Sequence, residues 1–330
     1  IQTIVGRQEG GVAMMAEASG KLTGRPGIAF VTRGPGATNA SAGVHIAFQD
    51  STPMILFVGQ IDSSQRDREA FQEVDYKKMF SPLAKWVAEI DSIERIPEYI
   101  SRAFSVALSG RPGPVVISLP EDTLFAKANV ADAPKVKLPK QMVSDQDVVD
   151  TINKLKDATN PFIIVGGSGW SSEAAKNLGK FAESLGIPVG TSFRCQDYLD
   201  NRHPNYVGDV GIAINPYLLT RIKMADCILV LNARLGEMTT GGYTMFDIPK
   251  TKPFLIHIHP DPNELGSVYQ PDIGLVCNSA EFVKRAASLS KEYQNKSPTK
   301  ERASYKDWQK PLTTPGNVKM EVIIKKLSNT

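Results

Sequence analysis

The stretch GIAFVTRGPGATNASAGVHIAFQDSTPMILFVGQ, residues 27–60, decides the fold class. Its two apolar runs, GIAFVT at 27–32 and PMILFVGQ at 53–60, have the length and the Gly or Pro boundaries of buried strands. The residues between them, ATNASAGVHIAFQDS, suit a helix. Buried strands that alternate with helices predict a parallel sheet covered on both faces.

The same alternation continues along the chain. Apolar residues recur at helical spacing from Ile93 to Leu108, and PVVISLP (114–120) follows as another strand. Further on, the sequence predicts four more strands and a helix, namely PFIIVGG, IPVGTSF, DCILVLNA and FLIHIHP around the helical SEAAKNLGKFAESLG. The predicted fold class is therefore α/β, with two doubly wound parallel-sheet domains, the second of them Rossmann-like.

Composition shifts mark the domain boundaries. Residues 126–143 are rich in Pro and Lys without periodicity, and Ser144 followed by Asp147 predicts a new helix start. A second linker runs from about 290 to 316, and a last helix follows it. The chain opens on IQTIVG, which has the pattern of a buried strand. We expect a fragment of a longer protein: an N-terminally truncated domain at 1–125, a linker at 126–143, a central domain at 144–290, and a linker plus the start of an absent domain at 291–330.

Bulk properties exclude several classes of protein. The 330 residues are 42% hydrophobic and 22% charged, and a net charge of +3 does not indicate nucleic-acid binding. The sequence contains neither an apolar run that would cross a membrane nor a signal peptide. The three cysteines, Cys195, Cys227 and Cys277, are far apart and odd in number, which argues against a disulfide framework or a zinc site. The prediction is a cytoplasmic protein.

Polar residues follow three predicted strands of the first domain. Glu9 ends the first segment, Gly34 and Gly36 lie in TRGPGATNA after the second strand, and Gln60 ends the third. Ligands of open parallel sheets bind outside the carboxyl ends of the strands. These residues therefore predict a binding site. For Glu9 alone, the alternative is an acid in the first turn of a helix, where negative charge is favourable.

Together, Arg7-Gln8-Glu9 leading into AMMAEA, TRGPGATNA, QDSTPMILFVGQ and AFQEVD resemble the pyrimidine-binding domain of thiamine-diphosphate-dependent enzymes of the acetolactate-synthase-like branch. The resemblance extends over essentially the whole chain. It implies that Glu9 is catalytic, bonding N1′ of the cofactor's aminopyrimidine and so promoting formation of the reactive carbanion. Burial among the small and apolar residues that follow would raise the pKa of Glu9, and the helix N-terminus would lower it.

The resemblance assigns further residues to the cofactor. Gly34, Pro35, Gly36 and Asn39 would shape the pyrimidine wall, and Gln60 would face the reacting centre or, alternatively, cap a strand end. The Gly-Asp-Gly motif that binds diphosphate and Mg²⁺ in this family does not occur in the chain, so the absent domain would supply it. A homodimer or homotetramer is implied, and the fragment alone would be inactive.

In the second domain, Gly166 and Gly167 belong to a glycine-rich segment suited to a phosphate at a helix N-terminus. Arg234 matches an arginine that contacts FAD in flavin-containing relatives, whereas the neighbouring family motifs do not match. The central domain could therefore bind FAD, another nucleotide or no nucleotide.

His257 and His259 could share a metal only with a third ligand, which is not evident. We interpret them as a solvated strand end, His45 as a core residue, and Glu17 as structural; no metal ligand is assigned.

The predicted function is thiamine-diphosphate-dependent decarboxylation of a small 2-oxo acid with transfer to a second carbonyl compound, as in acetolactate synthesis. Gln8 departs from the histidine usual in acetolactate synthases, which leaves the particular reaction open. The near alternative is a simple 2-oxo acid or acyl-CoA decarboxylase. Alternatives of another class are a non-catalytic nucleotide-binding module and a domain kept only for subunit contacts. No nucleic-acid or membrane partner is expected.

Overall fold

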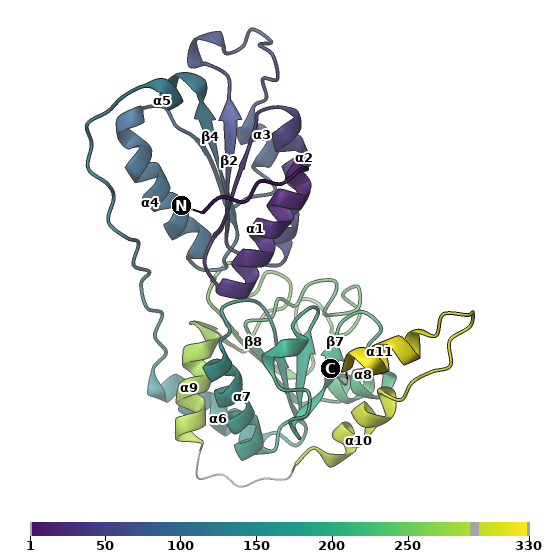
Figure 1. The fold of residues 1–330 in the computed structure, drawn as a ribbon. Coiled ribbons are helices and arrows are strands. Elements are labelled where there is room, and N and C mark those ends of the chain that lie inside the picture. The colour runs from purple at the N-terminus through teal and green to yellow at the C-terminus, as the bar shows by residue number, and fades with distance from the viewer. Residues whose placement is uncertain (1, 291–296, 329–330) are drawn as a thin grey trace. The chain divides into compact units, whose positions relative to one another are not determined.

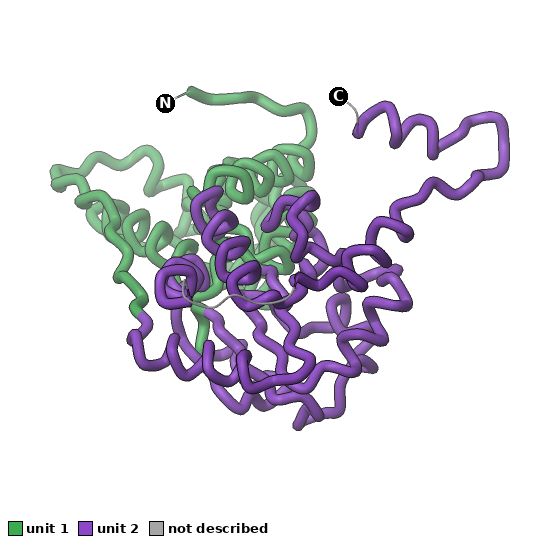
Figure 2. The backbone as a smooth tube through the Cα atoms, turned by 90° about the horizontal axis from the view of Figure 1, so that it is seen from below, with its two compact units in different colours: residues 1–142, 167–169, 260–262 green, residues 143–166, 170–259, 263–330 purple. Residues whose placement is uncertain are grey.

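The computed structural model describes residues 2–290 and 297–328. They form two compact units, coloured separately in Figure 2: the first comprises Ile1–Met142, Gly167–Gly169 and Pro260–Pro262, and the second the remaining residues. Three sequence-based predictions fall partly on positions outside the described residues. They are the first residue of IQTIVG, positions 291–296 of the second predicted linker, and the last two residues of the C-terminal segment.

The first unit contains a four-stranded sheet whose paired strands all run parallel. In spatial order the strands are β1 (Gly27–Val31), β2 (Met54–Gln60), β4 (Pro114–Pro120) and β3 (Trp86–Glu89). The helices are α1 (Glu9–Thr23), α2 (Pro35–Gln49), α3 (Tyr76–Phe80), α4 (Ile96–Leu108) and α5 (Glu121–Phe125) (Figure 1). Two 3₁₀ turns, Ser63–Gln65 and Ile93–Arg95, complete this unit.

Strand β2 shows why the sheet is covered on both faces. Met54, Leu56 and Val58 pack with α1, α2 and α3, whereas Ile55 and Phe57 pack with α4. Successive side chains of a strand point to opposite faces, so a continuous apolar run is expected only where both faces are buried. This is the physical basis of the sequence pattern at 53–60.

Helices α1 and α2 lie against each other and against the sheet through small residues. A methyl group at Gly43 of α2 would lie 2.5 Å from Cβ of Ala13 in α1. One at Gly27, the first residue of β1, would overlap the backbone carbonyl of Ala16 in α1. These close approaches fix the position of α1, and therefore of Glu9 at its first turn.

The second unit contains a six-stranded parallel sheet in the order β10-β9-β8-β5-β6-β7. Its strands are β5 (Pro161–Val165), β6 (Val189–Ser192), β7 (Tyr206–Val210), β8 (Cys227–Leu231), β9 (Phe254–His259) and β10 (Ile273–Val276). One core layer contains residues of α6 (Asp145–Asp157), α7 (Ser172–Leu185) and α9 (Ser279–Leu289), and the opposite layer contains residues of α8 (Pro216–Lys223). The 3₁₀ turn Gln196–Tyr198 and helices α10 (Thr299–Trp308) and α11 (Met320–Ser328) complete it.

The α/β fold class is confirmed, and the apolar runs singled out in the sequence form β1, β2, β4, β5, β6, β8 and β9. The strand predicted for IQTIVG is wrong in the described residues: Ile4 and Val5 are 75% and 91% exposed and belong to no strand. The core position predicted for His45 is also wrong, because this residue is exposed on α2. Three strands were not predicted, β3, β7 and β10, because their segments are short and do not stand out as apolar runs.

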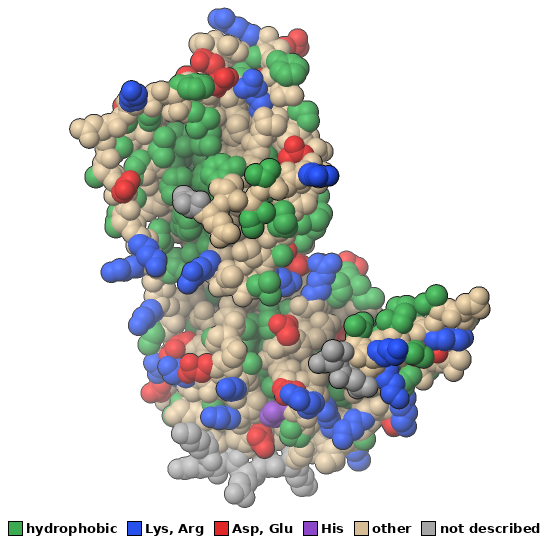
Figure 3. Space-filling model, in the orientation of Figure 1, with side chains coloured by type: hydrophobic (Ala, Val, Ile, Leu, Met, Phe, Trp, Pro, Cys, Tyr) green, Lys and Arg blue, Asp and Glu red, His purple; other side chains and the backbone are tan. Residues whose placement is uncertain are grey.

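The surface of the first unit exposes several large apolar side chains. Figure 3 shows hydrophobic side chains gathered on the face of this unit that is in view. The exposed set on α1 and β1 comprises Met14, Met15, Leu22, Ile28 and Phe30. Among the described residues, no helix has both the length and the apolar character needed to traverse a bilayer.

The close approach at Gly27 leads to a stability prediction. Gly27→Ala forces a methyl group into the Ala16 backbone, and overpacking of this kind costs about 1–3 kcal/mol. Hydrogen exchange of peptides from β1 and α1 should therefore accelerate. The control is Gly11→Ala, where the nearest atom to the new methyl group is 3.7 Å away and helix propensity favours alanine. Equal protection of the two variants would contradict this account of the packing.

Candidate active site

Glu9 is the first residue of α1 and lies partly buried at the carboxyl edge of the first sheet. Asn39 of α2 donates from Nδ2 to Oε2 of Glu9 at 3.1 Å. The N-cap residue Gln8 accepts from the amide of Gly11 at 2.7 Å, which fixes the start of the helix. Thus two residues predicted from separate segments, Glu9 and Asn39, are in direct contact.

The pKa of Glu9 lies below its ordinary value. The largest cause is the hydrogen bond from Asn39, and the second is the hydrogen bond from Glu9's own backbone amide. Desolvation acts in the opposite direction and is outweighed. Burial, which the sequence suggested would raise this pKa, is therefore outweighed, and the main cause of the lowering is the hydrogen bond from Asn39, which the sequence did not predict.

The turn Gly34-Pro35-Gly36 lies beside Glu9. A methyl group at Gly36 would lie 2.7 Å from Cγ2 of Thr32 and 3.7 Å from Oε1 of Glu9, so only glycine leaves this space open. Gly34 has a positive φ of 58°, and its amide donates to the hydroxyl of Tyr76 at 2.8 Å. Pro35 then starts α2 with the φ that a first helical residue requires.

The segment Phe71-Gln72-Glu73 lies next to this turn. Gln72 packs over Gly34, where an added methyl group would come 2.7 Å from Cβ of Gln72. The carboxylate of Glu73 accepts from the amides of Asp67 and Ala70, which closes the loop on itself. Phe71 is 78% exposed.

Gln60 is buried at the end of β2. Its Nε2 donates to the carbonyl of Val74 at 2.9 Å, and its Oε1 accepts from the amide of Ile61 at 3.0 Å. Oε2 of Glu89 lies 3.5 Å from the same Nε2. These bonds are the ones expected of an amide that caps a strand end, and its role at a reacting centre stays a prediction.

Two ion pairs that sequence reasoning did not select also lie at the carboxyl edge of this sheet. Arg33 follows β1 and pairs with Glu121, which follows β4, at 3.1 Å. Arg66 pairs with Glu89 at the end of β3. The position of Arg33 inside TRGPGATNA could have marked it as a site residue. No feature of the sequence could have marked Glu89, because strand β3 itself was not predicted.

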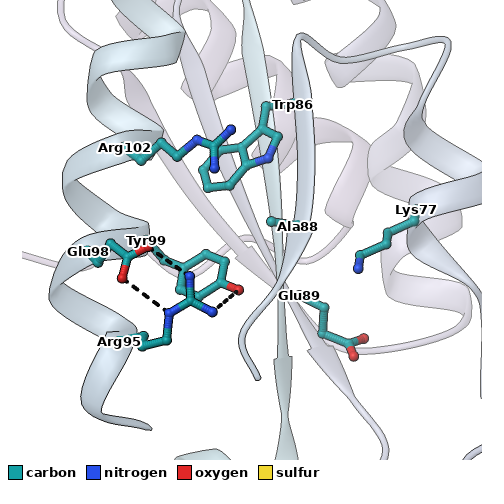
Figure 4. A pocket seen from close by; sticks show the side chains of 8 residues that line it. All are labelled: Lys77, Trp86, Ala88, Glu89, Arg95, Glu98, Tyr99 and Arg102. Carbon is teal, nitrogen blue, oxygen red and sulfur yellow. Dashed lines mark hydrogen bonds and ion pairs between the residues drawn. The ribbon is translucent and has the colours of Figure 1, made fainter. Parts of the chain in front are cut away.

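A cavity of about 180 Å³ lies on β3 and borders α3 and α4 (Figure 4). In it Arg102 lies over the ring of Trp86, and Arg95 bonds to Glu98 and to the hydroxyl of Tyr99. The lining residues are Lys77, Trp86, Ala88, Glu89, Arg95, Glu98, Tyr99 and Arg102. No residue predicted for the cofactor site is among them.

The site residues predicted for the central domain, Gly166, Gly167 and Arg234, lie after β5 and β8. Gly166 packs against Ser192 of β6, and its carbonyl accepts from the indole of Trp170 at 2.8 Å. Gly167 has a positive φ of 72°. Helix α7 begins only at Ser172, so the glycines do not themselves form its first turn. Arg234 pairs with Glu264 at 3.1 Å.

His257 and His259 are 3% and 2% exposed, so their interpretation as a solvated strand end is wrong. Nε2 of His257 lies 3.0 Å from the carbonyl of Ala233, and burial lowers the pKa of His257 to about 4. The end of this strand is buried, which the sequence pattern alone did not reveal.

Across residues 2–290 and 297–328, no group of three or more His, Cys, Asp or Glu side chains is arranged to hold a metal ion.

Comparison with known proteins now identifies the class. Residues 1–79 match the family model "Thiamine pyrophosphate enzyme, N-terminal TPP binding domain", and residues 148–286 match "Thiamine pyrophosphate enzyme, central domain". The two matches together cover most of the chain. The chain belongs to the thiamine pyrophosphate enzyme family.

Within this family, the chain is similar to acetolactate synthases. It is 29% identical to the acetolactate synthase large subunit of Corynebacterium glutamicum over 94% of the chain and 50% of that protein. It is 29% identical to the mitochondrial acetolactate synthase catalytic subunit of Saccharomyces cerevisiae, over 98% of the chain and 51% of that protein. It is 31% identical to a probable acetolactate synthase large subunit of Methanocaldococcus jannaschii, over 91% of the chain and 52% of that protein. The chain thus spans about half the length of these relatives.

The contact between Asn39 and Glu9 is directly testable. Asn39→Ala removes the main cause of the lowered pKa of Glu9, so this pKa should rise toward the ordinary glutamate value. The carboxyl chemical shift of Glu9 in an NMR pH titration measures the change. Ser41→Ala on the same helix is the control, because the Ser41 hydroxyl bonds to the carbonyl of Thr38 and not to Glu9.

The same substitution has a defined effect on the pH dependence of stability. A carboxyl whose pKa is lowered on folding stabilises the protein above its ordinary pKa, and this contribution is lost as the pH falls through the lowered value. Asn39→Ala should weaken that acid-side dependence. An unchanged titration of Glu9 would show that the hydrogen bond has no such effect in solution.

Proposed function

We propose that the first unit activates thiamine diphosphate through Glu9 in an enzyme that acts on small 2-oxo acids. The observation that carries this proposal is the position of one accessible carboxylate, which accepts a hydrogen bond from Asn39 and adjoins the space that Gly36 leaves open. The family membership and the similarity to acetolactate synthases support the same function.

The residues present fit the aminopyrimidine half of the cofactor. Glycine at position 36 leaves open the space next to Oε1 of Glu9, where a flat ring needs close access to backbone. Glu9 would bond a ring nitrogen, and Gly34 and Pro35 would extend the wall without bulky side chains. Asn39 would keep the carboxylate oriented, because its amide already donates to Oε2.

When bound, thiamine diphosphate supplies the nucleophilic carbon that attacks the 2-oxo group and accepts the electron pair released on decarboxylation. The task of the chain is to hold and move one proton at the Glu9 carboxylate. In the structure this carboxylate is stabilised in its ionised form by Asn39. Covering it with the flat ring of the cofactor would remove water and raise its pKa toward neutrality, which is the range in which general acid–base catalysis is efficient.

We further propose that the reaction is decarboxylation followed by transfer to a second carbonyl compound, as the similarity to acetolactate synthases indicates. Simple decarboxylation of a 2-oxo acid or acyl-CoA is the alternative outcome of the same chemistry. Mg²⁺ bound with the diphosphate, a homodimer or homotetramer and a cytoplasmic location also remain proposals from the resemblance. FAD binding by the second unit stays a prediction. Arg234, the residue expected to contact FAD, forms an ion pair with Glu264 in the structure.

Replacement of Glu9 tests the proposal. In the complete natural protein, Glu9→Gln should lower thiamine-diphosphate-dependent turnover of pyruvate or other 2-oxo acids by about 10²–10⁴-fold, because the amide cannot exchange the proton. Steady-state decarboxylation assays of the variant and the unmodified protein measure this loss of turnover.

Glu17→Gln is the matched control on the same helix. Glu17 is buried and accepts from the hydroxyl of Thr52 at 2.9 Å, a bond that a glutamine oxygen can also accept. This variant should keep near-normal turnover. Unchanged turnover in Glu9→Gln would overturn the proposal and favour a non-catalytic nucleotide-binding module.

A further inference from the structure

Strand β3 is the last strand of the first sheet and pairs only with β4 among the described residues. Its side chains alternate between two packed layers. Val87 contacts the layer that contains α3, whereas Trp86 and Ala88 contact the layer that contains α4. The cavity of about 180 Å³ is lined from α3, β3 and α4 together (Figure 4). Because a sheet separates its two faces, a cavity lined from both of them lies at the free edge of β3.

Two aromatic rings and two arginines form one wall of this cavity. The rings of Trp86 and Tyr99 are nearly parallel, with 6° between their planes and centroids 6.0 Å apart. The guanidinium carbon of Arg102 lies 4.4 Å from the centre of the Trp86 ring, and that of Arg95 lies 4.9 Å from the centre of the Tyr99 ring. A guanidinium can stack on an aromatic face and still offer its N–H groups to a planar anion. Stacking therefore holds Arg102 in place without using its hydrogen-bond donors.

The charged groups of the lining do not cancel one another. They are three cations and two carboxylates, namely Lys77, Arg95, Arg102, Glu89 and Glu98. Both carboxylates are held by arginines, because Glu98 pairs with Arg95 at 2.8 Å and Glu89 pairs with Arg66. The hydrogen bond from Arg95 also lowers the pKa of Glu98.

Two cations of the cavity remain available to a ligand. Within residues 2–290 and 297–328, the side chains of Lys77 and Arg102 form no hydrogen bond or ion pair. Lys77 belongs to α3 and Arg102 to α4, so they approach the cavity from opposite walls (Figure 4). A ligand with a negative group at each end can contact both cations at once, whereas a compact anion can contact only one of them.

The size of the cavity limits the ligand further. A volume of about 180 Å³ lies below the roughly 300–1,000 Å³ of pockets that hold drug-sized molecules. An extended peptide or a nucleotide therefore does not fit inside it. Ala88 is the smallest side chain of the lining and leaves room for a short carbon chain.

We propose that the cavity at the free edge of β3 binds a small dicarboxylate, with one carboxylate on Arg102 and the other on Lys77. The guanidinium fork of Arg102 matches the two oxygens of a carboxylate, and Lys77 supplies a point charge for the second group. No residue proposed to contact thiamine diphosphate lines this cavity, so the assignment does not depend on the proposed function.

Isothermal titration calorimetry of the complete natural protein tests the assignment. The probes are malonate and succinate, which are dicarboxylates of different length, and acetate and inorganic phosphate, which are compact anions. The better dicarboxylate should bind more tightly than either compact anion. Arg102→Gln should weaken its binding about 10- to 100-fold, the range typical of a lost hydrogen bond to a charged group. Lys77→Gln should reduce it to the affinity of acetate and leave acetate binding unchanged.

Two further variants serve as controls. Lys154→Gln removes a cation that makes the same kind of contact with an aromatic ring, 5.0 Å from the centre of Phe254, and that does not line the cavity. It should leave dicarboxylate binding unchanged. Glu98→Gln removes a carboxylate of the lining and releases Arg95, so dicarboxylate binding should stay the same or become tighter.

Three results would overturn the assignment. Equal dicarboxylate binding by Arg102→Gln and the unmodified protein would place the ligand elsewhere, the candidate active site included. Equal or tighter binding of acetate or phosphate would show that the two cations do not act together. Absence of saturable binding of every probe would show that the cavity is not a ligand site in the complete protein, as expected where another subunit covers the edge of β3.

Discussion

The close packing of α1 onto β1 and α2 is the constraint on which the candidate site depends. Gly27 and Gly43 bring three backbones so near one another that a single added methyl group would collide. This packing sets where α1 begins, and the N-cap bond from the Gly11 amide to Gln8 fixes that start. The first-turn carboxylate of Glu9 is thereby placed within hydrogen-bond distance of Asn39 on the neighbouring helix. A loosely packed helix would leave the carboxylate free to turn toward water.

The carboxyl edge of the first sheet is also where charges of both signs meet. Arg33 and Glu121 join the ends of β1 and β4, and Arg66 and Glu89 join a loop to the end of β3. Gln60 lies between them and is held by bonds within the fold. In the cavity at Trp86 and Arg102, Arg95 pairs with Glu98, and Arg102 lies over the ring of Trp86 (Figure 4).

The second unit shares the doubly wound architecture with a different distribution of polar groups. Its glycine-rich segment precedes α7 by several residues, Arg234 is engaged by Glu264, and the two histidines of β9 are buried. Burial keeps His257 neutral well below its ordinary pKa, so this pair contributes packing and a hydrogen bond to the strand end. Family membership rests on both units, whereas the catalytic proposal rests on the first.

The sequence by itself determined the α/β class and most of the strands, and it singled out Glu9, Gly34 and Gly36 as candidates. These follow from local signals, since apolar runs, glycine turns and a first-turn acid are readable over a few neighbouring residues. Asn39 was selected only through the family resemblance. Tertiary structure alone decided the contact of Glu9 with Asn39, the reach of Arg33 to Glu121, and the exposure of His45 and burial of His257. Such features depend on strand order and on which helix covers which face. Residues 30 or 88 positions apart meet only once the sheet is assembled.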